Sequence, residues 1–274
     1  MSWNMDSDID WSVFDSDKVE PGLLQIVKSA ALVEANASDY VTYLCRIWPE
    51  DEAMHSVFRQ WGREETQHGL ALARWASLAD PDFDFPPALE RFRHMQNIDT
   101  TAERSIRGSA TGELIARCVV ETGTSSLYAA IRDVTDEPVL KQLSARIAAD
   151  EFAHYALFSR LIKTQDPLPR RSRLKIALGR LFEASDDELA SAYFCAADRP
   201  SRPLTYERKT FSRAYQLGVM RIYQRKHINR LVAMIASAGG LKPHGLLSRI
   251  FQPLVWFTLN LQKRKLLRTA VSHI

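Results

Sequence analysis

The hydrophobic positions of the chain recur with a helical period over four long segments in its first 165 residues. This period, about 3.6 residues, is that of an amphipathic α-helix, whereas a half-buried strand alternates at every second residue. Pro21 lies near the start of the first segment and Pro49 just past its end, where proline commonly begins or stops a helix. We therefore predict four long helices, over residues 21–48, 51–78, 109–133 and 137–163.

The helical pattern is interrupted twice and then continues to the end of the chain. ADPDFDFPP, residues 79–87, breaks it with three prolines after the second helix. DPLPRRSR, residues 166–173, breaks it after the fourth. Beyond this second break the pattern predicts further helices over 173–197, 205–238 and 243–269, with Gly239–Gly240 between the last two.

The composition agrees with a helical globular protein and argues against several other classes. Of the 274 residues, 46 % are hydrophobic and 25 % charged, which is ordinary for a globular domain. The three cysteines form no CxxC pair, so we expect neither a disulfide framework nor a zinc knuckle. The acidic N-terminus lacks the basic and apolar regions of a secretory signal, and no run of about 18 apolar residues exists. We expect a cytoplasmic protein.

The net charge of +3 hides an asymmetry between the two parts of the chain. Residues 1–165 hold 16 Lys and Arg against 26 Asp and Glu, a net −10, whereas residues 166–274 hold 20 against 7, a net +13. A basic half favours an acidic partner or an anionic surface, although a solvated basic face would have the same composition. We expect no nucleic-acid partner.

Two of the predicted helices carry the same motif, ExxH, on their apolar faces. Segment 51–78 contains Glu65-Thr66-Gln67-His68, and segment 137–163 contains Glu151-Phe152-Ala153-His154. Residues three apart lie on one face of a helix, so each motif directs a carboxylate and an imidazole toward the core. The other two helices each carry one glutamate in the middle of the apolar face, Glu34 and Glu121. A single ExxH indicates little, but six such residues on four successive helices are hard to obtain by chance.

Four carboxylates in one core are unfavourable unless something compensates their charge. A buried, unpaired carboxylate either destabilises the fold or shifts its pKa until it is neutral. Two divalent cations would compensate four carboxylates, and two histidines would add neutral nitrogen ligands. Such an oxygen-rich set suits iron or manganese better than zinc. We therefore predict a four-helix bundle that binds two iron ions, with manganese as the alternative, through Glu34, Glu65, His68, Glu121, Glu151 and His154.

Two further residues are expected to support the metal ligands. Asp150 points about 100° away from Glu151 on its helix, so it could accept the free N–H of a ligand histidine on the neighbouring helix. The alternative is a surface acid. Thr124 lies one turn after Glu121 on the same face, where its hydroxyl could assist oxygen chemistry or bond to its own backbone. Glu64 is interpreted as a solvated or inter-helix acid.

Three stretches resemble the soluble acyl-acyl-carrier-protein desaturases. WGREETQHGLALARW resembles their first metal-binding motif, EENRHG in plant members, and RIAADEFAHYALFSRLI resembles the second, IAADEKRHE. VVETGTSSLYAA is similar to their third-helix segment, a glutamate followed three residues later by a threonine. The resemblance covers about residues 20–165 and implies the same six ligands, with Asp150 and Thr124 in the family's supporting roles. Phe152 and Ala153 depart from it, because plant members carry two basic residues there.

The resemblance implies a fold and a reaction. The expected fold is all-α: an acidic N-terminal tail (1–20), a ferritin-like di-iron four-helix bundle (21–165) and a basic helical region (166–274) packed on the bundle. The expected reaction is O2-dependent insertion of a double bond into a fatty acyl chain carried by acyl carrier protein. A ferredoxin-type protein would supply electrons, and the protein would form homodimers. An acidic carrier fits the basic C-terminal half.

Three other classes of function remain open. A di-iron oxygenase, acting as a hydroxylase or N-oxygenase on a different substrate, could use the same ligands. A ferritin-like storage or peroxide-scavenging bundle could also use them, but it would not need the long C-terminal region. The segment LLSRIFQPLVWFTLNLQKRKLLR, residues 246–268, combines apolar residues with Lys and Arg as interfacial helices do, so peripheral membrane contact is a third alternative. The same segment could instead dock on the bundle.

Overall fold

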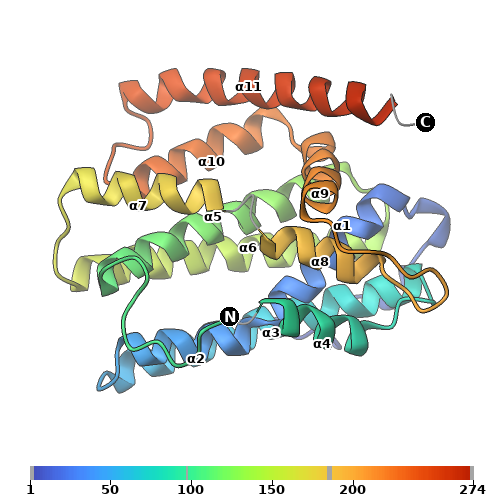
Figure 1. Cartoon of the computed structure of the whole chain (residues 1–274), viewed down its shortest axis with the longest axis horizontal. Helices are drawn as coiled ribbons and strands as arrows, with labels where there is room; N and C mark the ends of the chain where they lie inside the picture. The colour runs from blue at the N-terminus through green and yellow to red at the C-terminus, as the bar shows by residue number, and fades with distance from the viewer. Residues whose placement is uncertain (1–2, 97, 184–186, 272–274) are drawn as a thin grey trace.

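The computed structural model describes residues 3–96, 98–183 and 187–271, and within these ranges it is helical with no named strand (Figure 1). The all-α prediction is therefore confirmed. The α-helices are α1 Pro21–Ala35, α2 Ala37–Ile47, α3 Glu52–Ala79, α4 Phe85–Gln96, α5 Ala110–Val134, α6 Pro138–Leu161, α7 Arg170–Glu183, α8 Asp187–Ala197, α9 Arg208–Ile222, α10 Arg225–Ala238 and α11 Leu246–Val271.

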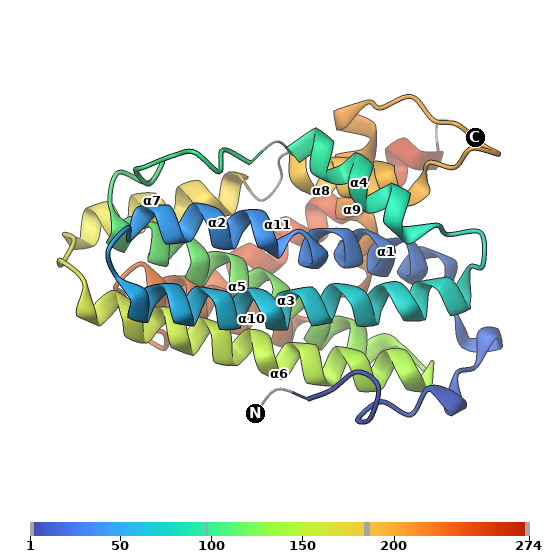
Figure 2. The same cartoon turned by 90° about the horizontal axis from the view of Figure 1, so that it is seen from below.

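Four long helices form the centre of the molecule. Helix α1 packs on α3, α5 packs along α6, and α3 also contacts α6. Figure 2 shows α3 and α6 side by side, with α1 and α2 following one another along α3. The predicted helices over 51–78, 109–133 and 137–163 correspond to α3, α5 and α6 within a few residues. Large fully buried side chains such as Phe58, Trp75 and Tyr128 fill the space between them.

The predicted helix over 21–48 is divided into α1 and α2 at Asn36, where the backbone leaves the helical region (φ −87°, ψ 9°). The break coincides with a close approach of α3. A Cβ added to Gly69 would lie 2.5 Å from the backbone nitrogen of Ala35, so only glycine fits here. Arg93 of α4 donates to the freed carbonyl of Ala35 at 3.0 Å and to the Asn36 side chain at 3.3 Å. The pattern of apolar residues continues through this point and could not show the break.

Three other boundaries differ from the prediction. Helix α4 lies in a region that the prolines of 79–87 made us treat as an interruption, and its own pattern was missed. The helix predicted over 173–197 is two helices, α7 and α8, on either side of residues 184–186, which lie outside the described residues. The helix predicted over 205–238 divides at Tyr223, where Gln224 caps the start of α10. The predicted break at Gly239–Gly240 is confirmed, and Gly240 adopts φ +80°.

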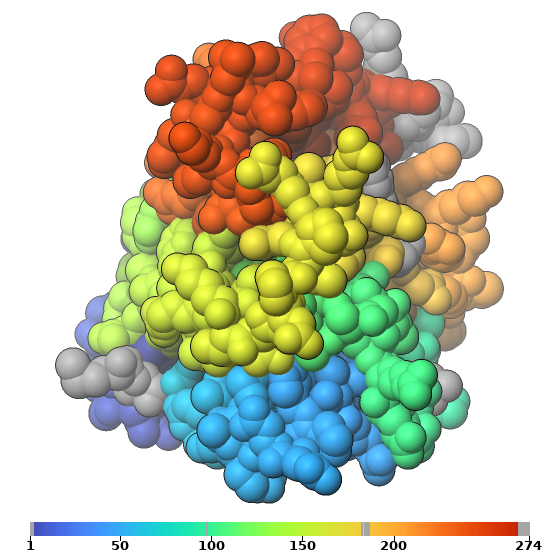
Figure 3. All heavy atoms as spheres, turned by 90° about the vertical axis from the view of Figure 1, so that its left-hand side faces the viewer, coloured from blue at the N-terminus to red at the C-terminus, as the bar shows by residue number. Residues whose placement is uncertain are grey.

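The C-terminal helices cover one side of the central four. Helix α8 packs on α1 and α4, whereas α7 and α10 pack on α5. Helix α11 lies outermost, on α10 and α9, at the top of Figure 1. Figure 3 shows the yellow surface of α7 between the blue N-terminal helices and the orange-red α10–α11 layer. None of the helices in the described part of the chain is both long and apolar enough to cross a membrane.

The segment before α1, expected as an acidic tail, lies against α3 and α6. Trp3 and Ile9 are buried in the core, and the backbone nitrogen of Asp10 donates to Gln142 at 3.2 Å. The Arg74 guanidinium stacks over the ring of Trp11 at 4.1 Å. These contacts hold the segment along the outside of the helix pair that carries the two ExxH motifs.

Replacing Gly69 with Ala is expected to destabilise the protein by about 1–3 kcal/mol, because the new methyl group meets backbone atoms of Ala35 rather than a movable side chain. Gly179→Ala is the matched control, since a Cβ there meets nothing within 4 Å and alanine favours the helix. Urea denaturation of the metal-free proteins measures both. An unchanged midpoint for Gly69→Ala would show that α1 and α3 are not held at this distance.

Candidate metal centre

The six predicted ligands meet in the interior, where four helices face one another. Their ligand atoms form two overlapping groups, within each of which all atoms lie within 4.8 Å of one another. The first group is Glu34 of α1, Glu65 and His68 of α3 and Glu151 of α6; the second is Glu65, Glu121 of α5, Glu151 and His154 of α6. Glu65 and Glu151 belong to both groups. Each group therefore has one histidine, one glutamate of its own and two shared glutamates.

All six side chains are buried, from 0 % exposed for His68 and Glu151 to 7 % for Glu65. Burial, and then the charge of neighbouring carboxylates, raises the pKa of Glu34, Glu65 and Glu151. The carboxyl groups are thus in an environment that disfavours their charged form. Protons or cations must be present for the cluster to persist in the core.

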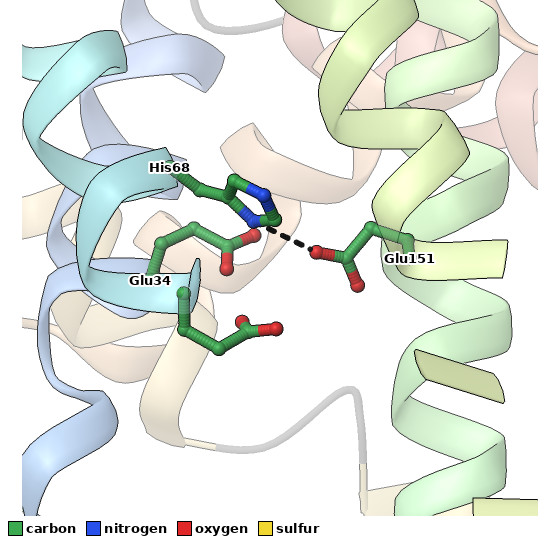
Figure 4. Close-up of side chains that lie close together, drawn as sticks. Glu34, His68 and Glu151 are labelled. Carbon is green, nitrogen blue, oxygen red and sulfur yellow. Dashed lines mark ion pairs between the residues drawn. The ribbon is translucent and has the colours of Figure 1, made fainter. Parts of the chain in front are cut away.

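The two histidines point their Nδ1 atoms at the centre. Nδ1 of His68 lies 3.1 Å from Oε1 of Glu151, the pair joined by the dashed line in Figure 4. Nδ1 of His154 lies 2.9 Å from Oε1 of Glu65 and 3.7 Å from Oε2 of Glu121. In Figure 4 the carboxylate of Glu151 reaches the His68 imidazole from the opposite helix. Each histidine thus contacts a shared glutamate of the other ExxH helix.

The other ring nitrogen of each histidine is held by an acid. Nε2 of His68 lies 3.0 Å from Asp150, and Nε2 of His154 lies 2.8 Å from Glu64. An imidazole that donates from Nε2 to a carboxylate keeps the lone pair of Nδ1 free for a metal. The expected contact of Asp150 with a histidine on the neighbouring helix is present, although its role in the chemistry stays a prediction. The alternative, that Asp150 is only a surface acid, does not describe these contacts.

Glu64 was interpreted as a solvated or inter-helix acid, and the inter-helix alternative is present, because Glu64 of α3 contacts His154 of α6. The sequence analysis did not name this partner. A sequence signal existed: both motifs are preceded by an acid, Glu64 before Glu65 and Asp150 before Glu151. The two helices therefore carry acid–Glu–x–x–His, and each acid holds the histidine of the other helix. The hydrogen bond from His154 lowers the pKa of Glu64, so this carboxylate is charged.

The protonation of the histidines follows from these contacts. Burial by itself would lower the pKa of His68, but its contacts with Asp150 and Glu151 outweigh burial and raise the pKa to about 9. Burial likewise opposes the charged form of His154, and its contacts with Glu121, Glu64 and Glu65 raise its pKa. Without metal, the cluster therefore retains protons on both carboxyl and imidazole groups. Metal binding would have to displace them.

Two aromatic residues that sequence reasoning did not assign also contact the cluster. The Trp3 indole donates to Asp150 at 2.7 Å and stacks on the His68 ring, with 6.1 Å between centroids. The Tyr128 hydroxyl donates to Glu34 at 2.5 Å. Tyr128 lies one turn after Thr124 on the same helix, so its spacing was a usable signal. Trp3 gave none, because its segment has no helical period.

Thr124 lies between the cluster and a cavity. Its hydroxyl donates to Oε2 of Glu151, and it is also 3.3 Å from the backbone carbonyls of Val120 and Glu121. The bond to its own backbone is therefore present together with a contact to a predicted ligand, and a role in oxygen chemistry stays a prediction. The same side chain forms part of the wall of a cavity of about 250 Å³.

The cavity is mostly apolar, and the C-terminal helices form part of its wall. Its wall includes Val33 and Val120, which immediately precede the ligands Glu34 and Glu121. Helices α8 and α10 contribute Leu189 and Ile235 from the other side. The charged residues of the wall are Arg180, Glu183 and Glu188. The region after residue 165 is thus part of the chamber beside the cluster.

The donor set fits divalent metal ions. Among the described residues, the buried side-chain atoms without a hydrogen-bond partner include Oε1 of three cluster glutamates and Nδ1 of both histidines: Glu65, Glu121, Glu151, His68 and His154. These unsatisfied atoms are electron-pair donors, and they are the atoms directed at one another. Leaving buried polar atoms unsatisfied is unfavourable unless a ligand completes them. Carboxylate oxygen with imidazole nitrogen is a set that iron and manganese accept.

Comparison with known proteins does not place the chain in a family. A scan against models of protein families found no match, and a search of curated proteins found no relative.

Replacing Glu65 with Gln should stabilise the metal-free protein and weaken metal binding. The folded-state pKa of Glu65 is raised, so its penalty is absent below the unfolded pKa, about 4.3, and grows as pH rises toward the folded value. We expect equal stability of variant and parent below about pH 4, and a gain of about 1–4 kcal/mol for the variant at high pH. Denaturation at several pH values measures the gap, and metal content of the same samples measures binding.

Glu137→Gln is the matched control, because Glu137 is equally buried but has its partners. It caps α6 by accepting from the backbone nitrogens of Val139 and Leu140, and it accepts from the Trp75 indole at 2.6 Å. We expect this variant to lose about 1–3 kcal/mol and to keep its metal. If Glu65→Gln instead behaved like Glu137→Gln, the cluster would be a structural network rather than a metal site.

Proposed function

We propose that this protein is an oxygen-dependent di-iron oxidase of the ferritin-like type that desaturates a fatty acyl chain. The observation that carries the proposal is the position of Thr124. This one residue contacts a carboxylate of the metal cluster and also forms the wall of an apolar cavity. A substrate in the cavity would therefore lie beside the metals. The desaturase-like sequence motifs support the same reaction.

The two overlapping ligand groups fit two iron ions that share Glu65 and Glu151. When bound, the iron pair would activate O2 and supply the oxidising power to remove hydrogen from an unactivated carbon. Glu34 and His68 would complete one position, and Glu121 and His154 the other. The ligand helices, with Asp150 and Glu64 behind the histidines, would keep both positions in place through a change of iron charge.

The chain's own residues would control access and proton position. The cluster side chains are at most 7 % exposed, so bulk water is excluded from the reacting centre. The Thr124 hydroxyl, at the boundary of cavity and cluster, can present a proton where oxygen would react. The Trp3 indole stacks on the His68 ring, with 6.1 Å between centroids, and Trp3 does not line the cavity. The reaction would therefore take place on the side of the cluster where Thr124 borders the cavity.

The cavity favours a narrow, apolar substrate. Its volume, about 250 Å³, is near the lower limit of about 300–1,000 Å³ for pockets that hold drug-sized ligands. Leu127, Val219 and Leu231 are among its side chains, and they offer no polar contact along most of the wall. A saturated hydrocarbon segment meets both conditions, whereas a bulky polar ring does not. The cavity also favours an oxidase over a storage bundle, which has no use for a chamber of this kind.

The partners of the reaction follow from the sequence resemblance and the charge. An acyl carrier protein is acidic, and Arg170 and Arg171 at the start of α7 are exposed and basic. We propose that the acyl chain is delivered by such a carrier, that a ferredoxin-type protein supplies electrons and that the protein acts as a homodimer. Product analysis decides the reaction: a saturated acyl carrier substrate should give an unsaturated product without oxygen from labelled O2. Labelled oxygen in the product would instead define a hydroxylase.

Filling the cavity at Gly123 should block the substrate without disturbing the metals. A Cβ at Gly123 meets nothing within 4 Å, so Gly123→Leu would extend into the cavity and would also favour the helix by up to about 1 kcal/mol. We expect normal iron content and at least about tenfold weaker binding of a fluorescent fatty acid. Gly179→Leu is the control, because this helical glycine also has open space but does not line the cavity. Unchanged fatty-acid binding by Gly123→Leu would contradict the assignment of the cavity.

Replacing Thr124 with Val should separate metal binding from oxygen chemistry. The hydroxyl contacts Glu151 but is not one of the six ligands, so iron content should stay near normal. Loss of a hydrogen bond worth about 1–3 kcal/mol in the transition state should slow oxidation of the ferrous protein by O2 by about one to two orders of magnitude. Rapid-mixing spectroscopy measures this rate without a substrate. A full rate would make Thr124 a bystander, and loss of iron would make it structural.

A further inference from the structure

Helix α11 presents a continuous apolar face to the outside of the molecule. More than half of the large hydrophobic side chains that are exposed in the described part of the chain belong to this one helix. Those along the centre of its outer face are Leu246, Ile250, Leu254, Phe257 and Leu261, with exposed fractions of 47–75 %. Successive members of this set are three or four residues apart, which keeps them on one side of a helix. Elsewhere exposed hydrophobic residues such as Leu78 and Ile106 stand singly, which is normal for a protein surface.

The inner side of α11 accounts for its position on the fold. It packs on α10 and α9, and Gln252 donates to the backbone carbonyl of Asn229 on α10 at 3.4 Å. Trp256 and Leu259 lie beside Met220 and Tyr223 of the α9 region. The helix is therefore docked on α9 and α10, whereas one sequence interpretation expected it to dock on the four-helix bundle itself, and its outer face is still apolar. The inner face of α11 can therefore pack on the protein while its outer face binds something else.

The charge around this face has a single sign. After Glu207 the chain contains no Asp or Glu, whereas residues 208–274 contain 13 Lys and Arg. On α11 itself, Arg249 lies at the edge of the apolar face, and Arg264 follows Phe257 on the same side seven residues later. Both are exposed. An apolar face with cations at its edge and end, and no anion, is the composition of a helix that lies in a membrane interface.

We propose that α11 binds the protein to the surface of an anionic lipid bilayer, with its apolar face in the headgroup region and its cations on lipid phosphates. A second copy of the chain fits less well. Antiparallel pairing of two α11 helices about Leu254–Phe257 would bring Arg249 of one copy near Lys263 and Arg264 of the other, with no acidic residue on the helix to compensate. Anionic phosphates satisfy the same cations.

The lipid surface would also lie near the substrate chamber. Helices α9 and α10, on which α11 rests, contribute Tyr223 and Leu231 to the wall of the apolar cavity. If the proposed function holds, an acyl chain taken from or returned to a membrane would have a short path to the cluster. Binding of lipid by α11 does not itself depend on that function, because it rests on the exposed face and its charge.

Flotation of the metal-loaded protein with vesicles tests the proposal. Vesicles of phosphatidylcholine with phosphatidylglycerol should carry the protein, and phosphatidylcholine alone should carry much less. Raising salt from about 0.1 M to about 1 M, which shortens the screening length from about 10 Å to about 3 Å, should weaken the binding. Leu254→Glu with Phe257→Glu should lower the partition coefficient at least about tenfold, since it removes two apolar side chains from the interface.

The matched control is Leu78→Glu with Ile106→Glu, which changes two exposed hydrophobic residues away from α11 by the same charge. This variant should bind vesicles like the parent. Iron content, measured on every variant, should be unchanged, so a failure of lipid binding is distinguishable from a failure of the metal site. The proposal is overturned if the parent does not bind anionic vesicles or if the α11 variant binds them equally. It is also overturned if the α11 substitutions abolish a lipid-independent dimer, which would make the face a subunit interface.

Discussion

The mutual repulsion of four buried glutamates is the constraint on which this structure depends. Glu34, Glu65, Glu121 and Glu151 come from four helices and meet where water is excluded. Burial first, and then the charges of Glu151 and Glu34, raise the pKa of Glu65 even though His154 lies 2.9 Å away. The fold therefore holds an unfavourable cluster in place by stability gained elsewhere. Sites of function are where such local disagreement with stability is expected.

The stability comes from the packing around the cluster. Gly69 allows α1 to approach α3 closely enough to place Glu34 beside Glu65. Glu137, a buried carboxylate with all its contacts made to N–H donors, fixes the start of α6 and shows how the chain treats an acid that is only structural. The difference between Glu137 and the four cluster glutamates is one of partners, not of burial. Because the cluster glutamates lack the N–H donors that Glu137 has, we infer that a bound cation completes their contacts.

Much of the centre could be predicted from the sequence because its information is local. A helix fixes which residues share a face, so ExxH in α3 and α6 and single glutamates in α1 and α5 were sufficient to name the residues that the structure brings together. Features that depend on contacts between distant segments could not be predicted from the sequence in this way. The break at Asn36 lies where Gly69 of α3 approaches Ala35, and Trp3 is held by contacts with His68 and Asp150. The cavity could not be predicted either, because part of its wall comes from α8 and α10, which are far in sequence from the ligand helices.

The acids that contact the two histidines, Asp150 and Glu64, could be predicted only in part. Asp150 was anticipated because its helix direction places it toward a neighbouring helix. For Glu64 an inter-helix contact was one of two interpretations, but its partner, His154, was not named. Comparing the two motifs, rather than each with a general expectation, would have found it. The near-symmetry of acid–Glu–x–x–His on two adjacent helices is a stronger signal than either copy, since each acid acts on the other copy's histidine.

The central claim is that six side chains hold two iron ions and that Glu65 and Glu151 are shared between them. Anomalous diffraction from crystals of the iron-loaded protein tests it most directly. The account predicts two iron peaks per chain, one beside Nδ1 of His68 and one beside Nδ1 of His154, with both shared carboxylates in contact with both peaks. A single peak, or iron bound anywhere else while the cluster keeps the metal-free contacts, would contradict it.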